Sequence, residues 1–236
     1  MRTGELGFWW RSLPTPPPHR EPLRGSIEVD VAIVGAGYTG LWTAYYLKRA
    51  QPSQRVVIVE AERVGFGASG RNGGWVSGFF AGAPRVYERE RGRAALVALQ
   101  RTMFATVAEI AAVIERERID ADLLHSGQLD VALDRPQAER LREHVRALHA
   151  LGFDERDLCV LDRDQLAERV RIDGAQLASC SPHVARVHPA KLVAGLAAAV
   201  EQAGTTIYER TPIREISAGE ARGDGALARA LDRSRD

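Results

Sequence analysis

The stretch DVAIVGAGYTGLWTAYYL, residues 30–47, joins a short apolar, β-branched run to a helical pattern through three glycines. The run before Gly35 shows little alternation, which is typical of a strand buried on both faces of a parallel sheet. Residues 38–50 continue as a helix, and RVVIVE, residues 55–60, has the composition of a second buried strand. The sequence therefore predicts a βαβ unit.

The three glycines have the spacing that a dinucleotide requires. Gly35 permits a tight exit from the strand, Gly37 has no side chain to keep a pyrophosphate from the backbone, and Gly40 lets the helix pack closely on the strand. The helix start offers free N–H groups to phosphates. Glu60 ends the next strand twenty residues after Gly40, where a carboxylate accepts hydrogen bonds from a ribose hydroxyl. We expect a nucleotide cofactor here; the alternative is a plain βαβ turn with a surface glutamate.

The glycine turn suits NAD and FAD equally, and the segment that follows Glu60 favours FAD. ERVGFGASGRNGG, residues 62–74, places five glycines around Ser69, Arg71 and Asn72. A NAD-binding domain normally continues into another helix there, whereas small residues with exposed N–H groups allow this loop to run beneath a large flat cofactor. We therefore expect FAD, with a NAD-dependent dehydrogenase as the alternative.

The middle of the sequence changes character and predicts an inserted domain. From about residue 86 apolar side chains recur at three- and four-residue intervals, which predicts a long amphipathic helix with the face Leu96, Leu99, Met103, Val107, Ile110 and Ile114. Residues 127–133 alternate as a strand, Asp134 and Pro136 open a further helix, and Asp162 with Gln165 forms a capping-box variant. HPAKLVAGLAAAVEQAG and TTIYER, residues 188–210, then predict a helix and a strand that return to the parallel sheet.

Composition argues against several classes of function. The 32 basic and 31 acidic side chains are interspersed, so we expect neither a nucleic-acid surface nor a membrane surface. The N-terminal segment carries prolines and charges, and no apolar run reaches the length of a membrane span, so we expect a cytoplasmic protein. Cys159 and Cys180 are expected to be two buried thiols, and no cysteine or histidine spacing indicates a metal site.

These pieces together resemble the D-amino-acid-oxidase-like FAD-dependent oxidoreductases, and most closely the bacterial gamma-glutamylputrescine oxidase branch. The resemblance rests on GFWW at residues 7–10, the strand, turn and helix quoted above, VVIVEAERVGFGASGRNGGW at residues 56–75, and the helix and strand over residues 188–213. It covers about residues 7–216 and corresponds to the N-terminal portion of such a protein.

The resemblance implies which residues hold FAD. The pyrophosphate turn would comprise Gly35, Gly37, Tyr38, Thr39 and Gly40, with Glu60 as the ribose ligand. The loop near the diphosphate and the isoalloxazine ring would comprise Ser69, Arg71, Asn72, Gly73 and Gly74. Arg71 could instead be a solvated surface charge, and Ile213 either offers its backbone to the adenine or is a core residue. No catalytic residue follows, because the flavin itself carries hydride chemistry.

The resemblance also implies the fold: an α/β protein with a Rossmann-like, glutathione-reductase-like FAD-binding parallel sheet and an inserted α+β substrate domain. We expect an extended lead-in at 1–26, pinned by its aromatic residues, and an FAD-binding domain at 27–77 and 186–216. The inserted domain is expected at 78–185 and a disordered or aberrant tail at 217–236.

The expected function is oxidation of a small-molecule amine or amino acid, with hydride transfer to flavin and oxygen as the acceptor. The first strand needs neighbours on both sides, yet the sequence after Ile216 contains no β-branched residue. We therefore expect the C-terminal part of the fold to be missing, leaving an apolar strand edge that self-associates or pairs with another chain. The alternatives are a non-catalytic flavoprotein fragment and one subunit of a heteromeric flavoenzyme.

Overall fold

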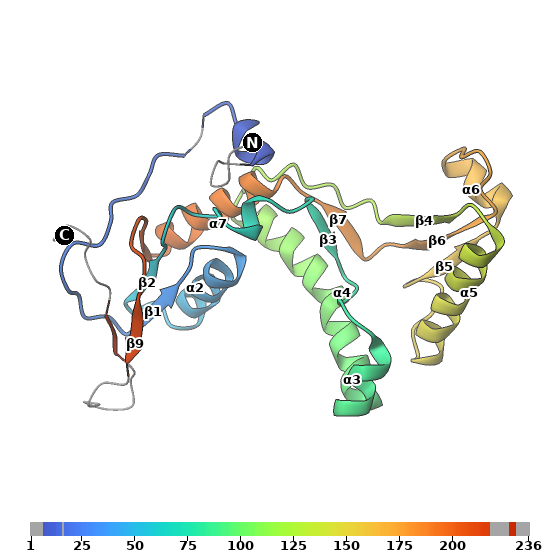
Figure 1. Ribbon diagram of the computed structural model, residues 1–236, viewed down its shortest axis with the longest axis horizontal. Coiled ribbons are helices and arrows are strands. Elements are labelled where there is room, and N and C mark those ends of the chain that lie inside the picture. Colours follow the sequence, from blue (N-terminus) through green and yellow to red (C-terminus); the bar gives the residue numbers. More distant parts are fainter. Residues whose placement is uncertain (1–6, 16, 218–226, 230–236) are drawn as a thin grey trace. The chain divides into compact units, whose positions relative to one another are not determined.

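The computed structural model describes residues 7–15, 17–217 and 227–229 (Figure 1). The chain forms two compact units. The first contains Met1–Gly74, Glu117–Ala121 and His188–Asp236, and the second contains Trp75–Arg116 and Asp122–Val187. The short segment Glu117–Ala121 lies inside the expected insert but belongs to the first unit, a detour that the sequence pattern did not indicate.

A three-stranded parallel sheet forms the centre of the first unit. Its strands are β1 (Val31–Val34), β2 (Val56–Val59) and β8 (Thr206–Tyr208), in the order β1-β2-β8. Val31 pairs with Val56, and Val57 pairs with Thr206. The predicted βαβ unit and the predicted return of the chain to the parallel sheet are therefore confirmed.

Two helices pack together beside this sheet, α2 (Tyr38–Ala50) and α7 (Pro189–Gln202) (Figure 1). Leu41 and Ala44 of α2 are buried, as are Val193 and Leu196 of α7. Pro189 occupies the first turn of α7, where its missing N–H is not needed, and Gly204 follows the helix with φ of 89°.

The lead-in is not extended throughout, because Phe8–Arg11 form one helical turn, α1. Trp10 of this turn is buried, so the expected anchoring by aromatic residues takes place through a helix. Further along, Arg20 binds Glu201 through two hydrogen bonds of 2.6 and 2.7 Å, and its backbone N–H donates to Glu209. The lead-in is thus fixed by both aromatic and charged contacts.

Strand β1 lies at one end of the sheet order, whereas β2 is buried along its whole length. The side chain of Val34 is 52% exposed, although Val31, Ile33 and Val34 are all apolar. Among the described residues β1 pairs only with β2. The strand that the sequence predicts to be central therefore lies at a sheet edge.

A separate antiparallel pair joins β9 (Glu215–Ser217) to β10 (Leu227–Arg229). The short strand β10 lies within the stretch for which the sequence predicts a disordered or aberrant tail. The rest of the expected tail, residues 218–226 and 230–236, lies outside the described part of the chain.

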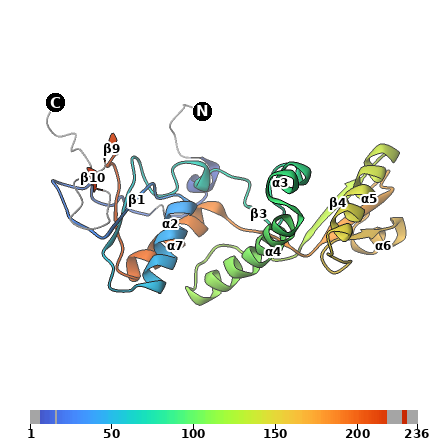
Figure 2. The ribbon, with the colours of Figure 1, turned by 90° about the horizontal axis from the view of Figure 1, so that it is seen from below.

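The second unit contains two antiparallel sheets. The larger sheet has the order β4-β6-β5, formed by Gln128–Ala132, Leu177–Ser181 and Cys159–Leu161. Helices α5 (Arg135–Ala150) and α6 (Arg163–Arg169) contact it (Figure 2). Both helices begin as predicted, at Asp134 and at the capping box of Asp162 with Gln165. The smaller sheet pairs β3 (Trp75–Ser77) with β7 (Val184–Arg186).

The predicted long amphipathic helix is interrupted near its start. Helix α3 (Pro84–Arg91) ends at Gly92, whose φ is 84°, and α4 (Arg93–Arg116) follows. Leu96, Val107 and Ile114 of the predicted face are buried, while Leu99, Met103 and Ile110 are half-buried. In the described part of the chain α4 is the one helix long and apolar enough to cross a membrane, a test that core helices of soluble proteins also pass.

Candidate cofactor site

The glycine turn between β1 and α2 has the tight geometry that its sequence predicts. Gly35 has φ of 95°, a conformation that favours glycine, and its N–H donates to the Val59 carbonyl at 2.8 Å. A Cβ on Gly40 would lie 2.0 Å from the Gly35 carbonyl oxygen, so the helix approaches the turn as closely as only glycine allows. Gly37 is the N-cap residue of α2.

Ser69 connects the loop after β2 to the start of α2. The Tyr38 N–H donates to Ser69 Oγ at 2.8 Å, which satisfies one of the free donors of the helix N-terminus. A Cβ on Gly37 would lie 2.9 Å from the same hydroxyl oxygen. The turn and the loop, which were predicted separately, therefore meet at the first turn of α2.

Glu60 follows β2 and holds the turn from the other side. Its Oε2 accepts from the Ala36 N–H at 2.8 Å, and its Oε1 accepts from the Glu62 N–H at 2.9 Å. The predicted ribose ligand is thus oriented by two backbone groups. Its half-buried carboxylate lies next to the residue that joins Gly35 to Gly37.

Asn72 organises the loop over residues 65–74. Its side-chain amide donates to the carbonyls of Ala68 and Ser69 at 3.2 and 2.9 Å, and its Oδ1 accepts from the Gly74 N–H. These bonds close around a one-turn 3₁₀ helix, Ala68–Gly70. Gly65, at the other end of the loop, donates to the Ala36 carbonyl at 3.0 Å.

Three of the predicted residues are exposed at the surface of the site. Thr39 and Gly73 are exposed. Arg71 is exposed as well, and its guanidinium lies 4.6 Å from the centre of the Phe66 ring while its Nε donates to the Phe66 carbonyl. Arg71 is therefore a surface residue held against the loop by Phe66.

The lead-in contributes three contacts that sequence reasoning missed. Trp9 Nε1 donates to the Asn72 carbonyl at 2.6 Å, and the Trp9 ring packs edge-on against His188 at 4.9 Å. His188 caps α7 by accepting from the Lys191 N–H at 3.3 Å, and its Nε2 lies 2.9 Å from Ser12 Oγ. The run GFWW indicated an aromatic anchor, but the sequence did not indicate which residues it contacts.

Tyr38 is held between α7 and the loop. Its hydroxyl donates to the Pro189 carbonyl at 3.1 Å. Burial raises the pKa of Tyr38 to about 12, against the opposing effect of a hydrogen bond to the Asn72 side chain. The phenol is therefore neutral at physiological pH and acts as a hydrogen-bond donor.

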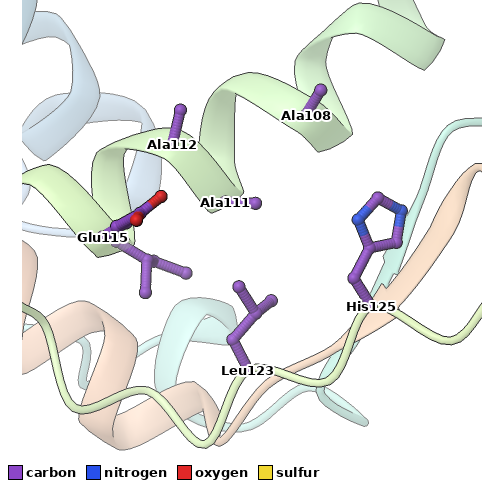
Figure 3. Close-up of a pocket in the computed structure, with 7 residues that line it drawn as sticks. Ala108, Ala111, Ala112, Glu115, Leu123 and His125 are labelled. Carbon is purple, nitrogen blue, oxygen red and sulfur yellow. The ribbon is translucent and has the colours of Figure 1, made fainter.

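The second unit contains a hollow of about 500 Å³ between α4 and the segment that includes Leu123 and His125. The lining residues are Ala108, Ala111, Ala112, Ile114, Glu115, Leu123 and His125. The three alanines, all on α4, leave this space open because their side chains are short. Figure 3 shows Glu115 and His125 on opposite sides of the hollow. The two polar groups do not converge on one point, so this arrangement carries no acid–base pair.

Among the residues that the structure describes, no three histidine, cysteine or acidic side chains gather as a metal site would require. The contacts of Ser69, Glu60 and Gly65 define the candidate site as the turn at Gly35–Gly40, Glu60 and the loop over residues 65–74.

Comparison with known proteins relates the chain to flavoproteins. A family model described as FAD dependent oxidoreductase matches residues 30–233. Gamma-glutamylputrescine oxidoreductase of Escherichia coli (strain K12) is 35% identical over 199 residues, which are 83% of this chain and 45% of that protein. The probable oxidoreductase OrdL of Rhizobium meliloti (strain 1021) is 31% identical over 216 residues, which are 89% of this chain and 48% of that protein.

Two solved structures share the fold of this chain. Glycine oxidase from Geobacillus kaustophilus has a TM-score of 0.59 at 27% identity, over 80% of this chain and 48% of that one. L-amino acid deaminase from Proteus vulgaris with the deletion of its specific insertion sequence has a TM-score of 0.67 at 19% identity, over 86% of this chain and 50% of that one. The chain spans about half the length of the curated relatives it matches. With a family model matched over most of its residues, this chain belongs to the DAO family of FAD-dependent oxidoreductases.

Proposed function

We propose that the turn at Gly35–Gly40, Glu60 and the loop over residues 65–74 bind FAD, and that the chain forms the FAD-binding part of an amine or amino-acid oxidoreductase. The observation that carries the proposal is the Ser69 contact. A hydroxyl from the loop reaches the N-terminus of α2, so the two segments expected around a diphosphate are already adjacent.

The residues present fit a dinucleotide. A Cβ on Gly35, Gly67 or Gly73 would meet no described heavy atom within 4 Å apart from its chain neighbours, so these positions border open space. Gly37 leaves the N-terminus of α2 uncovered by a side chain of its own, and the 13-residue helix directs its positive end there. The Glu60 carboxylate, oriented by Ala36, supplies the acceptor that a ribose hydroxyl needs.

Each part of the site has a different task in this proposal. The first turn of α2 binds the diphosphate, and Ser69 either shares the Tyr38 N–H with it or gives that donor up. Asn72 keeps the loop in shape, and Trp9 fixes Asn72 from the lead-in side. Bound FAD would supply the hydride acceptor, and the protein residues named here bind and orient it.

The substrate class proposed is a small amine or amino acid, with oxygen as the final electron acceptor. The names of a gamma-glutamylputrescine oxidoreductase and a glycine oxidase among the related proteins support an oxidation beside an amine nitrogen. Within the described residues no side chain is assigned to proton transfer, since the chemistry proposed requires hydride loss from the substrate rather than a dedicated nucleophile.

A second candidate is supported by the sheet edge. Strand β1 is apolar and lies at one end of the strand order, and the relatives are about twice as long as the matched region. We infer that activity needs further polypeptide, either in the same chain or as a separate subunit, that covers β1. By itself the present chain would then bind flavin weakly or without turnover.

Two measurements separate these outcomes. The chain is titrated with FAD, and flavin fluorescence gives the stoichiometry and the dissociation constant. Peroxide release is then followed with primary amines, polyamines, N-methyl amino acids and D-amino acids, before and after addition of a polypeptide corresponding to the other half of the relatives. Saturable binding of one FAD supports the cofactor proposal. Absence of FAD binding both with and without the added polypeptide contradicts it. Amine-dependent peroxide release from the chain alone would contradict the need for further polypeptide.

A further inference from the structure

Both cysteines lie in the second unit, on neighbouring strands. Cys159 of β5 and Cys180 of β6 are direct partners in the antiparallel register, and both are free and half-buried. Their side chains pack against the same apolar cluster, which includes Leu161 and Leu166. The expectation of two buried thiols is therefore corrected: the thiols are partly accessible and face each other across the strands.

The register of these strands brings the two cysteines close enough for a covalent bond. Residues directly opposite in an antiparallel pair have Cα atoms about 4.5–5.5 Å apart. Disulfides form between residues with Cα atoms about 4.4–6.8 Å apart. The Cα separation expected of such a pair is therefore compatible with a bond between Cys159 and Cys180.

The charges around the two sulfur atoms are different. Arg169, at the end of α6, donates from its guanidinium to Cys180 Sγ at 3.5 Å. Burial raises the pKa of Cys159, and the neighbouring Cys180 raises it further, against the positive charge of Arg169. A guanidinium stabilises a thiolate, and a thiolate is the form of cysteine that reacts with peroxides. The contacts assign Cys180 as the sulfur that reacts first and Cys159 as the thiol that follows.

We propose that Cys159 and Cys180 are a reversible redox pair that a hydroperoxide converts into a disulfide. In the first step the Cys180 thiolate attacks one oxygen of hydrogen peroxide, the O–O bond breaks, and Cys180 becomes a sulfenic acid with release of hydroxide, which a proton turns into water. In the second step the Cys159 sulfur attacks the Cys180 sulfur, the S–O bond breaks, and the proton from Cys159 leaves with that oxygen as water. Overall two thiols and one peroxide give one disulfide and two waters.

The bond would close a loop that contains helix α6 and the segment leading to β6. Residues 160–179 lie between the two cysteines, and the capping box of α6 lies inside this stretch. Oxidation would therefore couple the outer strand β5 covalently to the central strand β6. The proposal does not depend on flavin binding, because peroxide is supplied from outside in its test.

The test uses the full chain, reduced, desalted and exposed to a small molar excess of hydrogen peroxide. Intact mass and alkylation of remaining thiols after denaturation are followed with time. The expected product is a monomer lighter by two hydrogens with no thiol left, from which dithiothreitol restores both thiols. A product that keeps both thiols, or that is linked between chains, would overturn the proposal.

Three variants and one control variant test the order of the steps. Cys159→Ser should stop at a sulfenic acid on Cys180, which a dimedone label traps. In Cys180→Ser the remaining thiol, Cys159, should react with hydrogen peroxide about tenfold more slowly than the unmodified chain does, because the thiol beside the guanidinium is gone. Arg169→Gln should slow disulfide formation, whereas Arg163→Gln, at the other end of α6, should not. Equal rates of peroxide reaction for Cys180→Ser and the unmodified chain would show that the pair is not organised as proposed. Equal rates of disulfide formation for the two arginine variants would show the same.

Discussion

A carboxylate introduced at Gly37 should prevent cofactor binding without unfolding the protein. This residue is the N-cap of α2, a position where aspartate stabilises a helix. Gly37→Asp should therefore leave the fold intact apart from a shift of the Ser69 hydroxyl, while its charge repels a diphosphate. We expect flavin binding to fall below detection in a fluorescence titration. Thr43→Asp adds the same charge on an exposed part of α2 and should bind FAD normally, and a Gly37→Asp protein with one FAD per chain would disprove the site.

Glu60 offers a second test at the same scale. Glu60→Ala removes the carboxylate that accepts from Ala36, and we expect FAD binding to weaken by about 1–3 kcal/mol, the usual cost of a lost hydrogen bond to a charged group. Isothermal titration calorimetry gives the dissociation constant. Glu62→Ala, an exposed neighbour, is the matched control. An equal dissociation constant for Glu60→Ala and the unmodified chain would remove Glu60 from the site.

Glu209 makes the stability of the folded state depend on pH in the acidic range. Its side chain is 1% exposed. Burial alone would raise the pKa of Glu209, but backbone N–H groups of Val64 and Arg20 and the charge of Arg20 bring it below its ordinary value. A carboxyl with a lowered pKa stabilises the folded state above its unfolded pKa of about 4.3, and this contribution is lost as pH falls through the lower folded value.

The corresponding variant is Glu209→Gln. Removing one partner of a buried ion pair costs about 3–5 kcal/mol, and the loss should be largest near neutral pH and shrink as the pH falls below about 4. Urea unfolding at several pH values measures it. Glu201→Gln removes a more exposed partner of Arg20 and should cost about 1 kcal/mol or less. A Glu209→Gln protein as stable as the parent at pH 7 would contradict this account of the lead-in.

At the scale of elements, the contact between α2 and the turn depends on Gly40. An added Cβ would lie 2.0 Å from the Gly35 carbonyl oxygen, a backbone atom that cannot rotate away. Gly40→Ala should therefore lower the free energy of unfolding by about 1–3 kcal/mol, the cost of overpacking, although alanine is the better helix former. Urea denaturation measures the change. Thr43→Ala, exposed on the same helix, should have little effect, and a more stable Gly40→Ala protein would show that the turn adapts.

The elements that the sequence predicts well are those whose signals are local. The βαβ unit, the start of α5 at Asp134 and the capping box of α6 all depend on residues within a few positions of one another. The break at Gly92 was missed because one glycine in a helical pattern is compatible with continuation. The short strands β3, β6 and β7 are defined by their partners rather than by their own composition.

The candidate site was predictable in its parts and not in its connections. The glycine spacing indicated the turn, and the cluster of small residues indicated the loop. The Ser69 contact joins residues 31 positions apart, and the Trp9 contact joins residues 63 positions apart. Such distances in sequence are set by how the elements pack, which no local pattern specifies.

At the scale of the whole molecule, the apolar edge at β1 should govern solution behaviour. Among the residues that the structure describes, β1 has a partner strand on one side only, and an open edge with exposed apolar side chains such as Val34 is a template for association with other chains. We expect the chain to self-associate, and Val34→Lys should shift it towards the monomer in analytical ultracentrifugation. Tyr46→Lys, which removes an exposed aromatic side chain on α2, is the control. A parent chain that is monomeric at tens of micromolar would contradict this expectation.

The hydrogen bond from Trp9 to Asn72 gives the protein an intrinsic optical reporter. The Trp9 indole lies against the loop that Ser69 connects to α2, so any rearrangement of that loop changes the surroundings of a natural fluorophore. Tryptophan emission should therefore respond to loading even with ADP-ribose, a ligand without a flavin ring to absorb the light. Trp10 lies against Gly65 and Gly70 of the same loop, so replacement of Trp9 by phenylalanine should reduce this signal and leave the part that comes from Trp10. The kinetics of site assembly can then be followed in a stopped-flow instrument without any added dye.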